Sequence, residues 1–495
     1  MDLDQDACYR AVATRDTRFD GRFFTCVKTT GIYCRPVCPA KTPKRENMIF
    51  VPSAAAAEEA GFRPCLRCRP ETAPDRGAWR GSSNTVNRAL ALIELGALDA
   101  GDIVGLAGRL GVGERQLRRL FRQHLGASPI SVAQTRRVHL AKQLLHETRL
   151  PMAEVAMASG FGSIRRFNET FQDLFARPPS QLRRTAGEDV AAGPQGEVSI
   201  RLRYRPPYDW SAMLAFLAAR AVPGMEVVEN NAYARVIELD GEVGSVRVSP
   251  GEADCLVAQV CFPRLSALPT IIARLRRVFD LTADPQAINA HLSQDPALAP
   301  LVAARPGLRA PGGWDGFELA MRAVLGQQIT VGAAIRLAGK LVEAYGQPAP
   351  VSATGHPSLT RAFPRPEAIA AADLTHLGMP GSRARALSTV AKAVVDDPQL
   401  LGLNRSLEEA VERLKSLPGV GEWTAQYIAL RGMREPDAFP AADIGLMRAL
   451  AGLDGVRPNA AELLARAEAW RPWRAYAAQH LWAAAPTSTE AGLAA

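Results

Sequence analysis

The stretch that decides the fold of the second half of the chain is SLEEAVERLKSLPGVGEWTAQYIALRGMREPDAFPAAD, residues 406–443. Residues 406–415 have the apolar spacing of an amphipathic helix, and a second helix is expected to begin near Trp423. Between them, residues 417–421 (LPGVG) predict a tight hairpin, because glycine permits sharp backbone turns. Gly419 and Gly421 would also let backbone N–H groups approach a phosphate. A Gly-x-Gly hairpin alone is an ordinary turn, so a function can be inferred for it only from the neighbouring residues.

The residues around the hairpin give it a family context. A Phe-Pro-Ala-Ala run and Asp443 follow the second helix, and this order resembles the helix-hairpin-helix DNA glycosylases. GFELAMRAVLGQQITVGAAIRLAGKLVEAY (316–345) and RPWRAYAAQHLW (471–482) resemble the AlkA family of 3-methyladenine DNA glycosylases II. The resemblance implies a mostly helical glycosylase domain over residues 311–490, and it covers most of the chain after Glu197.

The same resemblance assigns a catalytic residue. Asp443 matches the catalytic aspartate, whose carboxylate would stabilise positive charge on the deoxyribose and position or activate water. An ordinary helix N-cap is the alternative role for Asp443, and the two roles are compatible. Trp423 occupies the position where bifunctional members carry a Schiff-base lysine. Base excision without strand cleavage is therefore expected.

Further positions match the base pocket and the DNA wedge of the AlkA family. Trp423, Tyr427 and Trp482 match pocket aromatics, which would attract a flipped cationic base. Taken singly, each of these aromatics is better explained as a core residue. Gln328 stands where an AlkA-type enzyme inserts a leucine wedge into DNA, and Ile329 is the alternative wedge.

Residues 197–310 predict a small α+β domain. Val198, Ile200, Leu202 and Tyr204 alternate with polar residues, as in a half-buried strand. Further strands are predicted at 233–239, 245–248 and 255–262, and helices at 210–221 and 270–279. This segment resembles the small N-terminal domain of the AlkA family.

Two close cysteine pairs mark residues 1–74: Cys34 with Cys38, and Cys65 with Cys68. In a chain without a secretion signal, such pairs indicate a metal before they indicate disulfides. Each pair can place two sulfurs on one tight turn, and two pairs give tetrahedral thiolate coordination of Zn²⁺. The spacing alone leaves open whether the site is structural or reactive. The remaining cysteines are expected to be small buried thiols: Cys8, Cys26, Cys255 and Cys261.

The residues around these pairs favour a reactive site. GIYCRPVCPA (31–40), RENMIFVPSAAAAEEAGFRPC (45–65) and GFRPCLRCRP (61–70) resemble the N-terminal domain of the Ada family. The resemblance implies that Cys34 accepts a methyl group from a DNA methylphosphotriester and that the other three cysteines complete the zinc site. Methylation would change the site charge from about −2 to about −1 and lower its repulsion from DNA phosphates. Candidate phosphate contacts are Lys41, Lys44, Arg45 and Arg67.

Residues 85–186 predict a basic helical module. Residues 103–184 hold thirteen arginines and one lysine against five acidic residues, a surplus equal to the net charge of +9 of the whole chain. A surplus so concentrated favours a polyanion partner over a solubilising face. LAGRLGVGERQLRRLFRQHLGASP (106–129) and MAEVAMASGFGSIRRFNETFQDLFARPPSQLRR (152–184) form two helix-turn-helix units, a pair that resembles the AraC family. The expected DNA contacts are Arg115, Gln116, Arg119, Ser163, Arg165 and Arg166.

The expected fold class is multidomain α+β, with a zinc-binding domain, an all-α tandem helix-turn-helix domain, a small α+β domain and a mostly α glycosylase domain. No apolar run approaches the roughly 18 residues of a membrane span, and the N-terminus lacks an apolar signal region. A cytoplasmic, nucleoid-associated protein without a membrane partner is therefore expected. No cysteine follows Cys261 and no Pro-Cys-His-Arg signature occurs. Neither an Ada-type O6-methylguanine methyltransferase nor an iron–sulfur cluster is expected.

Together these features predict a DNA alkylation repair protein with two functions. The second half would excise alkylated purines such as 3-methyladenine from double-stranded DNA. The first half would sense methylphosphotriesters and activate transcription from promoter DNA, with RNA polymerase as a partner. Three alternatives stay open: a regulator with an inactive glycosylase domain, a glycosylase merely tethered by its first half, and a structural zinc protein that binds RNA. Asp443, Trp423 and Tyr427 argue against the first alternative, and Cys34 with the basic helices argues against the second.

Overall fold

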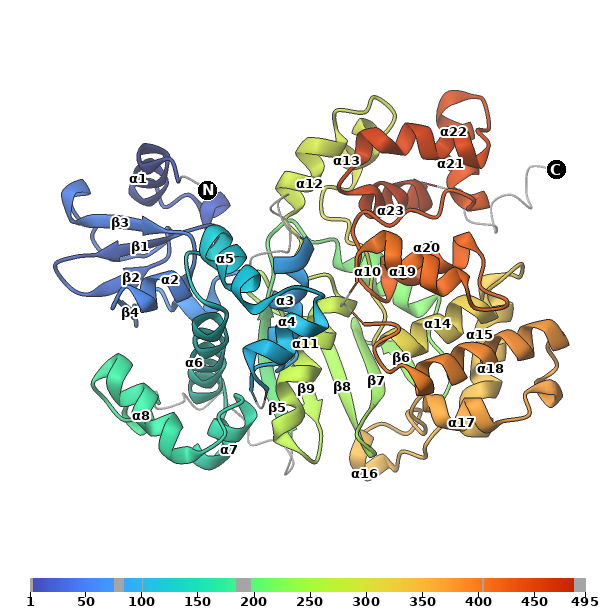
Figure 1. Cartoon of the computed structure of the whole chain (residues 1–495), viewed down its shortest axis with the longest axis horizontal. Helices are drawn as coiled ribbons and strands as arrows, with labels where there is room; N and C mark the ends of the chain where they lie inside the picture. The colour runs from blue at the N-terminus through green and yellow to red at the C-terminus, as the bar shows by residue number, and fades with distance from the viewer. Residues whose placement is uncertain (1–2, 75–83, 100, 184–196, 403–404, 485–495) are drawn as a thin grey trace. The chain divides into compact units, whose positions relative to one another are not determined.

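The computed structural model describes residues 3–74, 84–99, 101–183, 197–402 and 405–484. Two linkers are expected, at 75–84 and 185–196. Of their residues, Asn84 lies within the described ranges and the others lie outside them. The chain divides into two compact units: Met1–Tyr204 with Gly251–Ala273, and Arg205–Pro250 with Arg274–Ala495. Both units combine helices and strands (Figure 1), so the multidomain α+β class is confirmed. Within the described ranges, no helix is both long enough and apolar enough to cross a membrane.

The first unit begins with a four-stranded sheet in the order β3-β1-β2-β4. Strand β1 (Phe24–Val27) pairs antiparallel with β2 (Ile32–Cys34) and β3 (Met48–Val51), and β4 (Arg63–Pro64) pairs parallel with β2. Because β2 ends at Cys34 and β4 leads directly into Cys65, the parallel register brings both cysteine pairs to one end of the sheet. The flanking helices and turns are α1 (Gln5–Ala13), η1 (Thr17–Phe19), η2 (Arg45–Asn47), α2 (Ala54–Glu59) and η3 (Pro70–Thr72).

The tandem helix-turn-helix part follows in the same unit. Its helices are α3 (Asn84–Glu94), α4 (Ile103–Arg109), α5 (Glu114–Leu125), α6 (Pro129–Glu147), α7 (Met152–Ala158), α8 (Ile164–Phe175) and α9 (Pro179–Leu182). Leu117 and Phe121 are fully buried in the first helix-turn-helix core, as Phe167 and Phe171 are in the second. The two residues of each pair are four positions apart. This spacing puts both side chains on one face of their helix, which packs into the core.

Strands β5 (Glu197–Arg203) and β9 (Cys255–Cys261) pair antiparallel, and the turn η4 (Leu265–Ala267) also lies in the first unit. The alternating burial expected for β5 is present. In the second unit, β7 (Ala232–Leu239) pairs antiparallel with β6 (Glu226–Glu229) and β8 (Glu242–Pro250). Strand β6 was not predicted, because its four residues are all half-buried and show no alternation. Helices α10 (Trp210–Ala218) and α11 (Leu268–Val278) match the expected helices at 210–221 and 270–279.

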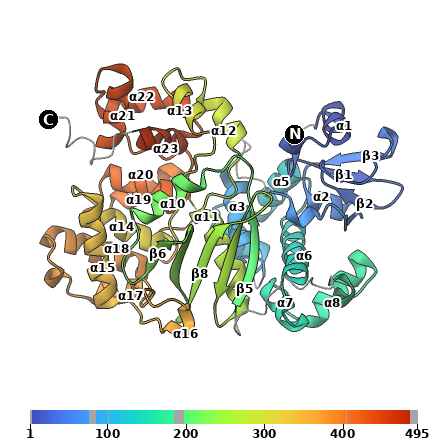
Figure 2. The same ribbon diagram turned by 180° about the vertical axis from the view of Figure 1, so that it is seen from behind.

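The rest of the second unit is helical, as Figure 2 shows from behind. Helix α14 packs on both α18 and α20, α19 packs on α20, and α21 packs on α23. The elements are α12 (Pro285–Leu292), α13 (Ala299–Ala304), α14 (Gly316–Leu325), α15 (Val331–Tyr345), α16 (Val351–Thr354), α17 (Pro366–Ala371), η5 (Thr375–Leu377), α18 (Gly381–Asp396), α19 (Leu407–Lys415), α20 (Glu422–Arg431), α21 (Ile444–Asp454), α22 (Ala460–Ala467), η6 (Glu468–Trp470) and α23 (Arg474–Ala484).

The hairpin between α19 and α20 forms where the sequence predicts it. Ser406 and Glu409 make a reciprocal capping box at the start of α19. Gly419 has φ +89°, a left-handed conformation that favours glycine. A Cβ atom at Gly419 would lie 2.5 Å from Cβ of Ala386 on α18. Glycine at this position therefore permits both the turn and its close packing on α18.

Candidate active site and metal centre

A cavity of about 650 Å³ lies in the second unit. Residues predicted for catalysis and for the base pocket meet in its wall: Trp423 and Tyr427 from α20, Asp443 from the start of α21, and Trp482 from α23. Ile329 also lines the cavity, whereas Gln328 does not. Ile329 and Trp482 line the same cavity although they are 153 positions apart in the sequence. The site is therefore assembled by tertiary packing.

The carboxylate of Asp443 is held by three donors. Its Oδ1 accepts from Leu446 N at 3.1 Å, which makes Asp443 the N-cap of α21. The indole Nε1 of Trp482 also donates to Oδ1 at 3.0 Å, and the indole Nε1 of Trp423 donates to Oδ2 at 2.8 Å. A cap needs only the first of these bonds, so the two indole bonds further restrict the orientation of the carboxylate at the cavity wall.

The three aromatics form one connected group. The Trp423 and Tyr427 rings stack with centroids 5.3 Å apart and an interplanar angle of 15°, and Tyr427 meets Trp482 edge-on at 6.3 Å. All three side chains are half-buried rather than enclosed. They face a cavity instead of filling the core, which is the arrangement that a flipped base requires.

Gln327 is a residue that the sequence analysis missed. Its Nε2 donates to the carbonyl of Gly419 at 2.9 Å and to Oγ1 of Thr424 at 3.0 Å, so it ties the α14–α15 loop to the hairpin. The neighbouring Gln328 is exposed and has φ +57°, a conformation that side-chain-bearing residues rarely adopt. No local pattern signals the Gln327 bonds, because their partners lie 92 and 97 residues further along the chain.

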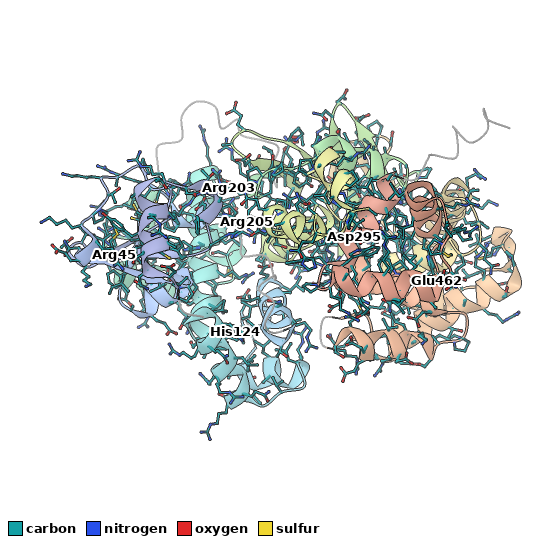
Figure 3. The ribbon with its side chains drawn as sticks, turned by 90° about the horizontal axis from the view of Figure 1, so that it is seen from above. Arg45, His124, Arg203, Arg205, Asp295 and Glu462 are labelled. Atoms are coloured by element: carbon teal, nitrogen blue, oxygen red, sulfur yellow. The ribbon has the colours of Figure 1, made fainter. Side chains whose placement is uncertain are left out.

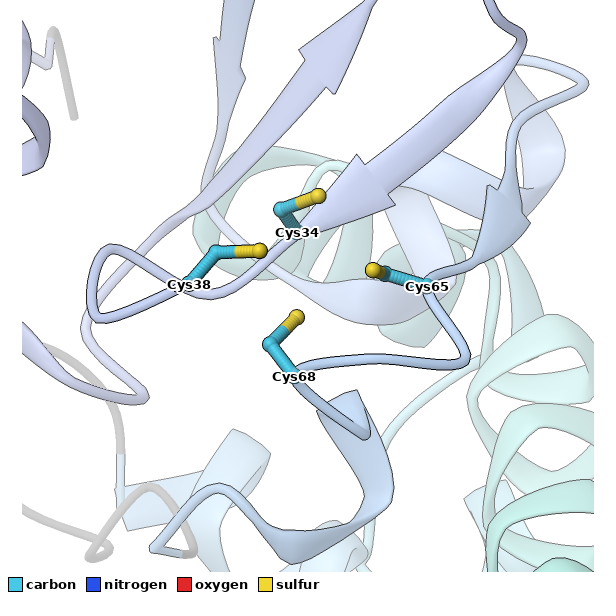
Figure 4. Close-up of side chains that lie close together, drawn as sticks. All are labelled: Cys34, Cys38, Cys65 and Cys68. Carbon is cyan, nitrogen blue, oxygen red and sulfur yellow. The ribbon is translucent and has the colours of Figure 1, made fainter. Parts of the chain in front are cut away.

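The four paired cysteines converge at one end of the first sheet. Their Sγ atoms all lie within 4.8 Å of one another, and Figure 4 shows the four sulfurs gathered around one common space. Cys65 and Cys68 are buried, while Cys34 and Cys38 are partly exposed. A compact set of four thiolates fits tetrahedral Zn²⁺, and the site is a zinc site. Of the other cysteines, Cys8, Cys26 and Cys255 are buried as expected, whereas Cys261 is only half-buried.

Arg35 places a positive charge beside the cysteine cluster. Its backbone N–H donates to Sγ of Cys68 at 3.4 Å, and its Nη1 donates to the Cys68 carbonyl at 3.2 Å. The guanidinium also bonds Thr72 Oγ1 at 2.7 Å and pairs with Asp20 through Nε at 2.8 Å. Because Asp20 pairs with the guanidinium, Arg35 acts on the cluster mainly through its backbone N–H, which donates to the Cys68 sulfur, and through its bond to the Cys68 carbonyl.

The predicted DNA contacts lie on accessible faces. Lys41, Lys44 and Arg67 are exposed, and Arg45, labelled in Figure 3, is half-buried against the rings of Tyr9 and Phe50. The candidate residues at the starts of α5 and α8 are all exposed: Arg115, Gln116, Arg119, Ser163, Arg165 and Arg166. Ser163 also caps α8 by accepting from Arg166 N, while Gly113 provides no side-chain cap for α5.

Helix α6 is bonded to the zinc-binding part by buried polar groups. Lys142 Nζ lies 2.7 Å from Glu71 Oε2, and both side chains have 0% exposure. Burial acts to raise the pKa of Glu71, but the charge of Lys142 outweighs it and lowers that pKa to about 2. The Tyr33 hydroxyl donates to Glu58 at 2.8 Å and lies 3.0 Å from Nε2 of His139 on α6. Burial raises the pKa of Glu58 to about 7.

Four family models match consecutive stretches of the chain. They are the metal binding domain of Ada (residues 7–71), a helix-turn-helix domain (106–185), the AlkA N-terminal domain (199–315) and the HhH-GPD superfamily of base excision DNA repair proteins (321–475). The four matches follow one another along the chain in the same order as the cysteine pairs, the helix-turn-helix units, the small α+β segment and the helix-hairpin-helix segment.

Similar proteins agree with these models. A probable bifunctional transcriptional activator/DNA repair enzyme AlkA from Mycobacterium tuberculosis is 42% identical, with 97% of each chain covered. DNA-3-methyladenine glycosylase 2 of Escherichia coli is 37% identical over 57% of this chain and 95% of its own. The solved structure of a 3-methyladenine DNA-glycosylase from Archaeoglobus fulgidus is 25% identical, with a TM-score of 0.51, over 57% of this chain and 97% of its own. The chain therefore belongs to the AlkA family of bifunctional transcriptional activators and DNA repair enzymes.

Proposed function

We propose that the second half of this chain excises alkylated purines such as 3-methyladenine from duplex DNA and leaves the strand intact. The observation that carries the proposal is the carboxylate of Asp443, held by the Trp423 and Trp482 indoles at the wall of a cavity large enough for a flipped base. The HhH-GPD match over residues 321–475 supports the same assignment.

The reaction follows from the placement of that carboxylate. The bond between C1′ of the deoxyribose and the base nitrogen breaks, and its electron pair leaves with the base. Positive charge then develops on the sugar, where the Asp443 carboxylate stabilises it. A water oxygen bonds to C1′ and loses a proton, which gives an abasic sugar.

We expect the strand to stay intact, because the described lining of the cavity offers no amine that could trap the sugar. Cleavage by a bifunctional glycosylase needs a lysine at the base pocket, and Trp423 occupies the position expected for it. Among the described residues that line the cavity, none is a lysine. Methylated duplex incubated with the chain should give free base and abasic sites that break only after heating in alkali. Nicks formed without that treatment would refute the monofunctional mechanism.

We also propose that Cys34 accepts a methyl group from a DNA methylphosphotriester. The Cys34 thiolate forms a bond to the methyl carbon as the carbon–oxygen bond breaks, and the electron pair stays on the phosphodiester oxygen. The four cysteines would hold Zn²⁺, and their thiolates would then stay deprotonated near neutral pH. Cys34 is suited to this role because it is one of the two partly exposed cysteines of the cluster.

Peptide mass spectrometry tests the acceptor. After incubation with methylated DNA, the peptide with Cys34 should gain one methyl group, and a Cys34→Ala chain should gain none at the other three ligands. Methyl transfer to Cys38 in the wild-type chain would contradict the assignment.

The helix-turn-helix units are proposed to bind promoter DNA and to recruit RNA polymerase in the cytoplasm, at the nucleoid. The exposed arginines of α5 and α8 support this role. A reporter driven by the chain's own promoter should respond to an alkylating agent only when Cys34 is intact. A reporter that never responds would favour the alternative in which the first half only tethers the glycosylase to DNA.

A further inference from the structure

Arg431, the last residue of α20, is a buried cation at the base cavity. It lines the cavity and is only 3% exposed. Its Nη1 donates to the Pro311 carbonyl at 2.7 Å and its Nη2 donates to Oε1 of Gln479 at 3.0 Å. Both partners are neutral, and no ion pair of Arg431 is present among the described residues. A buried charge without a counter-charge is costly, so its retention beside a reaction site suggests a function.

Two other arginines in the same wall are neutralised, whereas Arg220, which is half-buried, and Arg305, which is exposed, have no ion pair among the described residues. Arg235 lies 2.6 Å from Glu318, and Arg322 lies 2.6 Å from Glu226. Arg431 is therefore a buried cation of the lining without an ion pair among the described residues, and it shares the cavity with the Asp443 carboxylate, which is held by neutral indoles. Burial lowers the pKa of Arg431 to about 10, which leaves the side chain protonated at neutral pH.

The Arg431 guanidinium engages the rings of the base pocket. Its Cζ lies 5.4 Å from the centroid of Tyr427, 5.0 Å from that of Trp482 and 4.5 Å from that of Phe216. The electron-rich faces of these rings attract cations. Because the Arg431 guanidinium already lies against them, a cationic base would be attracted less strongly. A second cation brought into the cavity would also be repelled by the first. The pocket is thus less suited to cationic bases than its aromatic residues alone suggest.

We propose that Arg431 is a specificity-determining residue that shifts the glycosylase toward neutral damaged purines. The proposal rests on the glycosylase function proposed above. When the bond to C1′ breaks, a cationic base takes the electron pair and leaves neutral. A neutral base takes the same pair and becomes an anion until it gains a proton from water. The positive charge of Arg431 stabilises that anion and gives no such help to a base that leaves neutral.

Full-length chain and two duplexes test this role. One duplex carries hypoxanthine as the neutral purine, and the other carries 7-methylguanine as the cationic purine. Single-turnover rates of base release give the ratio of neutral to cationic excision. In Arg431→Gln the ratio should fall by about tenfold or more, with the 7-methylguanine rate unchanged or raised. Arg431→Lys keeps the charge and should retain most of the wild-type ratio.

Two further variants keep the proposal falsifiable. Gln479→Glu would place a carboxylate next to the Arg431 guanidinium without removing it, and it should lower the ratio as Arg431→Gln does, even if the latter folds poorly. Arg220→Gln is the matched control, because Arg220 lines the same cavity but is half-buried, so solvent screens its charge, and it stacks only on Phe216 among the described rings. Its ratio should stay near that of the wild type.

The outcomes separate this proposal from the function on which it rests. A fall in both rates by the same factor in Arg431→Gln and Gln479→Glu would show a merely structural role and overturn the proposal. An unchanged ratio in both variants would overturn it as well. If the wild-type chain released neither base and no 3-methyladenine, the glycosylase function itself would fail, whereas release of 3-methyladenine without hypoxanthine would overturn only this proposal.

Discussion

At the residue scale, the two indoles that bond Asp443 serve a purpose beyond stacking. Each N–H donates to a different carboxylate oxygen, at 2.8 Å from Trp423 and 3.0 Å from Trp482. Charge-assisted bonds of this kind stabilise the ionised carboxylate and hold its orientation before the sugar becomes positive. Trp423, Trp482 and the Asp443 carboxylate are therefore parts of one hydrogen-bonded unit.

Trp482→Phe separates ring packing from hydrogen bonding to Asp443, because phenylalanine keeps an aromatic ring and removes the N–H. A lost hydrogen bond to a charged group is worth about 1.5–3 kcal/mol, so the single-turnover rate of base release should fall about tenfold or more. Tyr427→Phe is the control, since Tyr427 makes no hydrogen bond to Asp443 among the described residues. Equal rates for Trp482→Phe and wild type would show that the indole serves only to stack.

At the scale of elements, the hairpin between α19 and α20 depends on one of its two glycines for its shape. Gly419→Ala would impose a left-handed φ on alanine and bring its Cβ to 2.5 Å from Ala386, so we expect a loss of about 1–3 kcal/mol in stability. Gly421→Ala is the matched control, because Gly421 has an ordinary φ of −88° and no atom within 4 Å of the added Cβ. Thermal unfolding measures both variants. Equal melting temperatures would contradict the packing argument.

Elements of this kind were predictable where the signal is local. The apolar spacing of α19, the Gly-x-Gly turn and the alternation of β5 are each set within a few neighbouring residues, and each element forms as expected. The contacts that complete the site were not predictable in this way. Gln327 reaches Gly419 across 92 residues, and Arg431 reaches Pro311 across 120. Whether a buried arginine has a counter-charge depends on tertiary packing, which no window of sequence encodes.

At the scale of the whole molecule, the zinc-binding part and the helix-turn-helix part of the first unit share a polar core. The Lys142–Glu71 ion pair is fully enclosed, and Glu71 follows Cys68 by three residues. Removing one partner leaves an unpaired buried charge, which costs about 3–5 kcal/mol. Glu71→Gln and Lys142→Met should each speed hydrogen–deuterium exchange of peptides from α6, and the double variant should restore much of the protection. Unchanged exchange in both single variants would show that the pair does not hold the two parts together.

The central claim is that this chain is an active glycosylase and that Asp443 is its catalytic residue. The most direct test compares release of 3-methyladenine from methylated duplex DNA by wild type and Asp443→Asn. Asparagine caps helices as well as aspartate does, so the variant should fold normally. It should nevertheless lose about a hundredfold or more in rate, because it removes the carboxylate charge. Equally fast release by the variant would contradict the role of Asp443. A wild-type chain that binds DNA and frees no base would instead be a regulator with an inactive glycosylase domain.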